Sequence, residues 1–280
     1  MPEPDITQTD LLPKLERACA EALAHGALGP IDTDSARIAD HGIDFVVRTI
    51  SNLARKEAAT RPGDGGDPFA PPYESPLHVG HVPPDHVALL NKFPVIENHL
   101  LVVTREFRDQ QEPLEKPDFE ALLRVLAHFD ALAFYNSGPH AGASQPHCHL
   151  QFIPRVETLP LESVIAASKP LPFPHAVAAV DSAWLDDPAT GAQQLWDTYR
   201  TLVQQVGRAD PASGDTGGSY NLLVTREHAW AVPRVNEWYG PVNVNALGYA
   251  GLLLAADRDQ ARLIRDDGPL HIITSTADRT

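Results

Sequence analysis

The chain has 280 residues, of which 43% are hydrophobic, and a formal net charge of −15 at pH 7. This length suffices for one large domain or two small ones, and the acidic balance argues against non-specific binding to nucleic acid or membranes. Two cysteines are too few for a secreted disulfide scaffold, and the sequence has neither a signal-peptide pattern nor an apolar run of about 18 residues, so we expect a cytoplasmic protein.

The first half of the chain alternates helical and strand patterns. Apolar residues at helical spacing, an aspartate cap at Asp10 and Gly26 predict the first helix, and Pro117 suits the first turn of the second. The predicted elements in chain order are a helix at 11–24, a strand at 44–50, a Pro- and Gly-rich loop at 61–84, strands at 86–93 and 99–104, and a helix from 117 to about 131.

The second half continues the mixture. A turn-rich stretch precedes the central strand, and several later strands are joined by short turns. The predicted elements are a strand at 147–153, a long connection at 154–188, a helix at 189–206, a hairpin of strands 219–225 and 229–233, a helix at 243–256 and a strand at 271–274. This mixture favours an α+β fold, with an antiparallel sheet flanked by helices and elaborated by loops.

One internal similarity stands out. Residues 100–106 (LLVVTRE) resemble residues 222–227 (LLVTRE). The match is either the trace of a duplicated half or the chance recurrence of an apolar strand ending in Thr-Arg-Glu.

The chemistry is concentrated in the predicted strand at 147–153. Alternate side chains of a strand share a face, so His147, His149 and Gln151 point together while Cys148 points to the other face. Two imidazoles and an amide are costly to bury without partners, so we expect them to line a cleft. A neutral imidazole is a good nucleophile near pH 7 and can attack phosphorus, whereas the glutamine amide can donate a hydrogen bond but cannot shuttle a proton.

A His-x-His pair by itself has other interpretations. It can be part of a metal site or simply two partly exposed histidines. A metal site needs further ligands; Cys148 is expected to face away and His140 has no fixed geometry, so we predict no metal site built from protein side chains. The histidines at 78, 81, 86 and 99 are interpreted as loop or strand residues, and the four tryptophans as core or interface residues rather than adenine stackers.

Taken together, these segments resemble the diadenosine tetraphosphate phosphorylases, also called ATP adenylyltransferases, of the transferase branch of the histidine-triad superfamily. The resemblance extends from about residue 44 to residue 256. It is carried by Asn136-Ser137-Gly138, residues 142–151 (GASQPHCHLQ), and residues 89–93, 99–107, 219–223 and 245–251. It implies a single histidine-triad-like domain over 1–280, with the His-x-His-x-Gln strand in an N-terminal part to about 155 and a C-terminal part, about 156–280, that completes the pocket.

The resemblance also implies roles. His149 would be the nucleophile on the α-phosphorus, with His147, Gln151 and Asn136 as the other catalytic residues, and Gln151 stands where hydrolytic relatives carry a third histidine. The implied substrate-binding residues are Lys56, Asn91, Ser137, Gly138, Ser144, Gln145, Thr225 and Arg234. The family often has lysine between the two histidines, so Cys148 means one fewer basic group near the site.

The implied reaction is phosphorolysis of diadenosine tetraphosphate to ATP and ADP, and its reverse, through an adenylyl-histidine. Its partners would be the nucleotide and inorganic phosphate, and Mg²⁺ would arrive with the substrate, with no organic cofactor. Base preference, chain length, metal requirement and oligomeric state (monomer or dimer) are left open. A histidine-triad hydrolase, a non-catalytic nucleotide-binding sensor and a hexose-phosphate nucleotidyltransferase are the alternatives, and the last would need a sugar pocket that the sequence does not reveal.

Overall fold

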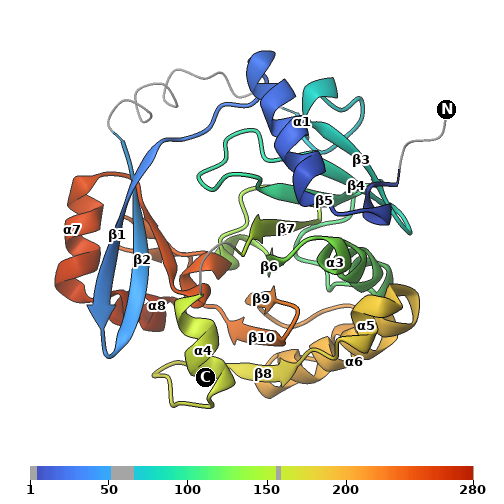
Figure 1. Ribbon diagram of the computed structural model, residues 1–280. Coiled ribbons are helices and arrows are strands. Elements are labelled where there is room, and N and C mark those ends of the chain that lie inside the picture. Colours follow the sequence, from blue (N-terminus) through green and yellow to red (C-terminus); the bar gives the residue numbers. More distant parts are fainter. Residues whose placement is uncertain (1–4, 52–65, 156–158, 280) are drawn as a thin grey trace.

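The computed structural model describes residues 5–51, 66–155 and 159–279. Its centre is an eight-stranded sheet in the order β3-β4-β5-β7-β6-β9-β10-β8, in which every neighbouring pair is antiparallel (Figure 1). The strands are β3 (His78–Val82), β4 (His86–Leu90), β5 (Leu100–Thr104), β6 (Ala131–Asn136), β7 (His149–Pro154), β8 (Ala176–Ala179), β9 (Tyr220–Val224) and β10 (His228–Pro233). The sheet confirms the predicted α+β class, and strands from both parts of the chain share it.

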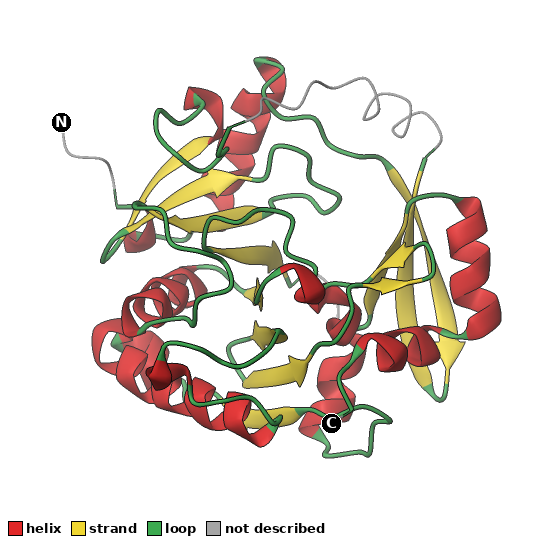
Figure 2. Ribbon diagram, turned by 180° about the vertical axis from the view of Figure 1, so that it is seen from behind, coloured by secondary structure: helices red, strands yellow, loops and turns green. Residues whose placement is uncertain are grey.

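Helices cover one face of this sheet (Figure 2). Apolar side chains such as Leu122, Tyr199, Val102 and Leu150 form one buried cluster between helices and strands. Burying this much apolar surface is the main force that holds the two layers together. The elements of this layer are α1 (Leu12–Ala24), α3 (Lys116–His128), α5 (Ala183–Asp186) and α6 (Pro188–Gln205).

A second layer packs on the opposite face. A three-stranded sheet in the order β1-β2-β13 and short helices form a second buried cluster with side chains of the large sheet, including Phe134 and Trp230. The elements of this layer are β1 (Thr33–Asp40), β2 (Ile43–Ile50), β13 (Leu252–Ala255), α4 (Pro160–Ala166), α7 (Arg258–Asp267), α8 (Pro269–Thr276), the ribbon β11 (Trp238–Tyr239) and β12 (Val242–Asn243), and the 3₁₀ turn η5 (Ala246–Ala250). The other 3₁₀ turns are η1 (Ile6–Gln8) and η2 (Ser75–Leu77), which pack with the helix layer, and η3 (Pro139–Ala141) and η4 (Pro211–Ser213).

Two predicted elements near the C-terminus are wrong. The helix predicted at 243–256 is instead β12, η5 and β13, because Asn245 caps only a short turn and Gly251, at φ +92°, ends it. The strand predicted at 271–274 lies within helix α8, which begins at Pro269, a residue that suits the first helical turn.

Other elements were missed. Strand β3 lies inside the predicted loop at 61–84, and α4, β8 and α5 lie inside the predicted connection at 154–188. Strand β1 has few apolar residues and exposes most of its side chains, so its sequence shows no clear alternation; antiparallel pairing with β2 defines it instead.

The large sheet contains two similar units. Each is a strand, a helix and two further strands, β5-α3-β6-β7 and β8-α6-β9-β10, and they meet at the antiparallel pair β6–β9, where Asn136 lies opposite Asn221. The similarity between residues 100–106 and 222–227 is not the trace of this repeat, because β5 is the first strand of its unit and β9 the second.

Candidate active site

His149 begins β7 and has one ring nitrogen available for chemistry. Its Nδ1 lies 2.7 Å from the carbonyl oxygen of His147, which can only accept a hydrogen bond, so Nδ1 carries the proton and Nε2 keeps its lone pair. The ring is 3% exposed and lies beside Phe69, with 5.0 Å between ring centroids. Burial lowers the pKa of His149 to about 4, so the imidazole is neutral at pH 7.

His147 lies just before β7, and its ring is held by protein groups. Nε2 lies 2.8 Å from the carbonyl oxygen of Thr104, and Nδ1 lies 2.7 Å from a carboxylate oxygen of Asp67. Both ring nitrogens therefore already have partners within the protein. Through its backbone carbonyl His147 selects the tautomer of His149, and through its ring it anchors the start of the strand.

Gln151 follows on the same face and connects His149 to a residue that the sequence did not single out. Its Nε2 lies 3.4 Å from Nε2 of His149, and its Oε1 lies 3.1 Å from Nε2 of His99. Nδ1 of His99 in turn lies 3.1 Å from the amide nitrogen of Asn91. His99, interpreted from the sequence as a loop or strand residue, lies directly before β5 and also lines the cleft. The pairing of β5 with β7 places it beside Gln151.

Gln110, a second residue that the sequence analysis did not identify, fixes the start of β7 by hydrogen bonds. Gln110 is buried, and its Oε1 accepts a 2.7 Å hydrogen bond from the backbone N–H of His149 while its Nε2 donates to the carbonyl oxygen of Asn136 at 2.9 Å. The side-chain oxygen of Asn136 accepts from Ala246 N and from Asn221. Gln110 thus ties the candidate nucleophile to the end of β6, and Asn136 ties β6 to β9 and to η5.

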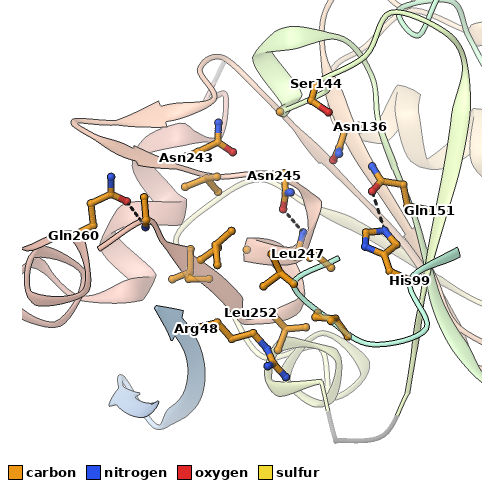
Figure 3. A pocket seen from close by; sticks show the side chains of 18 of the residues that line it. Arg48, His99, Asn136, Ser144, Gln151, Asn243, Asn245, Leu247, Leu252 and Gln260 are labelled. Atoms are coloured by element: carbon orange, nitrogen blue, oxygen red, sulfur yellow. Dashed lines mark hydrogen bonds between the residues drawn. The ribbon is translucent and has the colours of Figure 1, made fainter. Parts of the chain in front are cut away.

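A cleft of about 420 Å³ opens between the catalytic face of the large sheet and the second layer. Figure 3 shows Gln151, His99, Asn136 and Ser144 on one side of it, and Leu247 and Leu252 among the residues on the other. The outer lining includes exposed aromatic side chains, Phe93 and Trp238, together with Arg48 and Gln260. Of the four tryptophans, which were expected to be core or interface residues, Trp230 is fully buried, whereas Trp238 is exposed and lines the cleft. An apolar cleft with polar groups at its inner end suits a ligand with a base and a phosphate chain.

The turn between β6 and β7 approaches this cleft. Gly142 and Ser144 line it, and Gly142 is at φ +88°, where an added Cβ would lie 2.7 Å from Cβ of Asn245. Gly138 is at φ +82°, and an added Cβ would meet the side chain of Gln111 at 2.7 Å. Both positions therefore require glycine. Ser137, Gly138 and Gln145 belong to the same turn but are not among the residues that line the cleft. His147 and His149 do not line it either, so of the His-x-His-x-Gln residues only Gln151 does.

Three other predicted substrate-binding residues, Lys56, Thr225 and Arg234, are not among the described residues that line the cleft. Lys56 lies outside the described residues. Thr225 is buried and donates to Glu162 at 2.7 Å, and Arg234 is buried and donates to Asn221 and to backbone carbonyls of surrounding loops. Thr225 and Arg234 do not line the cleft; Arg234 supports it from behind, because one of its carbonyl partners belongs to Val244 in the lining.

The second unit of the sheet has no equivalent nucleophile. When the two units are aligned on Asn136 and Asn221, Ser219 corresponds to Phe134. Gln151 lies opposite Phe134, and Arg234, whose N–H donates to the carbonyl oxygen of Ser219, therefore takes the position of Gln151 in the second unit. The positions of His147 and His149 are then taken by Trp230 and Val232, which are fully buried. One strand of the repeat therefore carries the chemistry.

Cys148 faces the helix layer, as predicted from strand alternation. Its side chain is buried beside Arg108, whose Nη2 lies 3.0 Å from Sγ, and burial raises the pKa of the thiol to about 12. A thiol with this pKa is unreactive at neutral pH, so Cys148 serves packing. Within the described ranges, no three His, Cys, Asp or Glu side chains gather as metal ligands, and no helix is long and apolar enough to cross a bilayer.

Comparison with known proteins places this geometry in a family. The family model "Ap4A phosphorylase N-terminal domain" matches residues 1–168, and "ATP adenylyltransferase C-terminal domain" matches residues 169–277, where Ap4A is diadenosine tetraphosphate. The chain is 29% identical to diadenosine 5',5'''-P1,P4-tetraphosphate phosphorylase 2 of Saccharomyces cerevisiae, covering 94% of this chain and 92% of the relative, and 28% identical to Protein APA1 of the same yeast, covering 83% of each.

Solved structures agree with this match. Yeast Ap4A phosphorylase Apa2 in complex with AMP superimposes with a TM-score of 0.79 at 26% identity, covering 98% of this chain and 99% of that one. Apa2 in complex with Ap4A gives a TM-score of 0.76 at 25% identity, covering 95% and 96%. Since one family model alone covers more than half of the sequence and the fold agrees throughout, the chain belongs to the Ap4A phosphorylase family of nucleotidyltransferases.

Proposed function

We infer that this protein is an Ap4A phosphorylase that cleaves diadenosine tetraphosphate with inorganic phosphate to ATP and ADP, with His149 as the covalent nucleophile. The observation that carries this inference is the single unprotonated nitrogen of His149, which faces the side-chain amide of Gln151, a residue that lines the apolar cleft. The family membership supplies the substrate class.

Two displacements at phosphorus account for the reaction. In the first, the Nε2 lone pair of His149 attacks the α-phosphorus, the P–N bond forms, and the bond from phosphorus to the bridging oxygen breaks with release of ATP. In the second, an oxygen of inorganic phosphate attacks the same phosphorus, the P–N bond breaks, and its electron pair returns to Nε2 as ADP leaves. The proton stays on Nδ1 throughout and is donated in a hydrogen bond to the carbonyl oxygen of His147, which stabilises the positive charge on the ring.

The arrangement assigns supporting roles to the other residues. Gln151 is placed to donate to an oxygen on the reacting phosphorus, and His147 and Asn136 act by holding His149 and the turn in place rather than by proton transfer. The Gly142–Ser144 side of the turn is the part positioned to meet the phosphate chain. We propose that any Mg²⁺ arrives bound to the polyphosphate, because the lining side chains of the described cleft include no carboxylate. We also propose a cytoplasmic location, consistent with the two free cysteines, Cys19 and Cys148.

Turnover of Ap4A with and without labelled phosphate tests the function. The label should appear in the β position of ADP, and ATP should be the other product. Equal formation of AMP without phosphate would instead identify a hydrolase. Failure to trap an acid-labile adenylyl adduct on His149, together with intact nucleotide binding in His149→Ala, would identify a non-catalytic sensor.

A further inference from the structure

An ordered series of hydrogen bonds leads to the nucleophile. It begins at the backbone N–H of Phe93, which donates to Oδ1 of Asn91 at 3.1 Å, and continues from Asn91 to His99, Gln151 and His149. It ends at the backbone carbonyl of His147, 2.7 Å from Nδ1 of His149. Its two ends are a group that can only donate and a group that can only accept.

These fixed ends determine the direction of every bond between them. Since Oδ1 of Asn91 accepts from the backbone, its NH₂ group faces His99 and must donate to Nδ1. The neutral His99 ring then carries its proton on Nε2 and donates it to Oε1 of Gln151. The NH₂ group of Gln151 is therefore the end that faces Nε2 of His149.

We propose that Asn91 and His99 are positioning residues that select which end of the Gln151 amide faces the reacting phosphorus. This assignment rests on the proposed function of His149. It makes Asn91, which the family resemblance had suggested as a substrate-binding residue, a residue that orients His99, and it makes His99 the residue that orients Gln151. A freely rotating amide would present its oxygen for part of the time, and that oxygen would repel the phosphoryl oxygens. The series removes this alternative before the substrate binds.

The series also stays neutral under reaction conditions. Burial lowers the pKa of His99 to about 4, only partly opposed by its hydrogen bond to Gln151, so no member holds a transferable proton near pH 7. A water molecule attacking adenylyl-His149 must lose a proton, whereas inorganic phosphate already carries negative charge on its oxygens. A donor without proton-transfer capacity at position 151 therefore favours phosphate over water.

The tautomers provide a test that does not depend on activity. In ¹⁵N-histidine-labelled protein at pH 7, long-range ¹H–¹⁵N spectra should show His99 protonated on Nε2 only and His149 protonated on Nδ1 only. The His99 signals are assigned by their loss in His99→Phe. Protonation of His99 on Nδ1, or on both nitrogens, would overturn the proposal even if the enzyme is fully active.

A double-mutant cycle tests the functional coupling. His99→Phe should lower kcat about tenfold or more while leaving KM for Ap4A nearly unchanged, and it should raise the share of AMP formed by water. In the Gln151→Ala background the same change should have almost no further effect, because His99 acts through Gln151. Multiplying effects in the double variant would overturn the proposal, and so would an unchanged product ratio in His99→Phe.

Controls separate this test from misfolding and from the function itself. His25→Phe, the same substitution at an exposed histidine, should match wild type. If His99→Phe does not fold, Asn91→Ala replaces it in the cycle, since it removes the donor to Nδ1 and frees the His99 tautomer. If the wild-type protein forms no adenylyl-His149, the proposed function is wrong. The ¹H–¹⁵N measurement of the His99 and His149 tautomers would still test the direction of the hydrogen bonds independently.

Discussion

Replacing Gln110 by methionine removes the clamp behind His149 while keeping the volume of the side chain. The backbone N–H of His149 has the Gln110 oxygen as its acceptor at 2.7 Å, so the variant leaves a buried donor unsatisfied, at a cost of about 1–3 kcal/mol. The carbonyl oxygen of Asn136 keeps its bond from Gly138, so losing the Gln110 Nε2 donor, which also contacts the carbonyl oxygen of His149 at a longer 3.3 Å, costs only about 0.5–1.5 kcal/mol.

Together these losses should destabilise the fold by about 1.5–4.5 kcal/mol, which at about 2–4 °C per kcal/mol lowers Tm by about 3–18 °C. Turnover should fall as well, because the start of β7 is no longer tied to β6 and His149 loses its fixed position relative to Gln151. Thermal unfolding and steady-state kinetics on the same preparation measure both effects.

The matched control is Gln111→Met, the same substitution at the exposed neighbouring residue, which should leave Tm nearly unchanged. A Gln110→Met variant with the Tm and kcat of wild type would refute the view that the buried amide holds His149 in place. A lower Tm with unchanged kcat would show that Gln110 stabilises the sheet without positioning the nucleophile.

Further predictions concern the nucleophile, the turn and the third triad position. His149→Ala should abolish turnover and His149→Gly should regain some with free imidazole; residual activity in the alanine variant within about tenfold of wild type would contradict covalent catalysis. Because burial lowers the pKa of His149 from its ordinary value of 6.5 to about 4, single-turnover adenylylation should stay constant down to about pH 5, and an acid limb centred near 6.5 would contradict this. The same lowered pKa means that the unfolded chain binds a proton at His149 more readily than the folded protein does. The free energy of unfolding is therefore unaffected by His149 above pH 6.5 and falls as the pH drops from 6.5 toward 4, and this pH slope should shrink in His149→Ala. Gly142→Ala should destabilise more than Gly214→Ala: both carry positive φ and a strain of about 1–2 kcal/mol, but only Gly142 meets a neighbour, Asn245, and equal Tm losses would exclude that clash. Gln151→His should increase AMP formation by water, and an unchanged partition between water and phosphate would show that position 151 does not control the acceptor.

Local patterns predicted much of the fold. Helices α1, α3 and α6 follow from apolar periodicity, because each buries one face. The hairpin β9–β10 follows from two short apolar runs around Arg226-Glu227, and both of its strands are buried on both faces. The errors fall where periodicity is weak or where glycines interrupt it, as in the segment from β12 to β13. Weakly patterned elements such as β1 exist because a partner strand supplies their hydrogen bonds.

The order of residues along one strand determined the centre of the site. Strand alternation alone put His147, His149 and Gln151 toward one face and Cys148 toward the other, because the side-chain period of a strand is independent of its surroundings. The tautomer of His149 depends on the carbonyl of its near neighbour His147. The roles of Gln110 and His99, and the burial of Thr225 and Arg234 away from the cleft, were decided by contacts between residues from 13 to 63 positions apart. Hydrogen-bond direction is a property of paired atoms, so only the tertiary structure, which brings β4, β5, β6 and β7 side by side, could settle it.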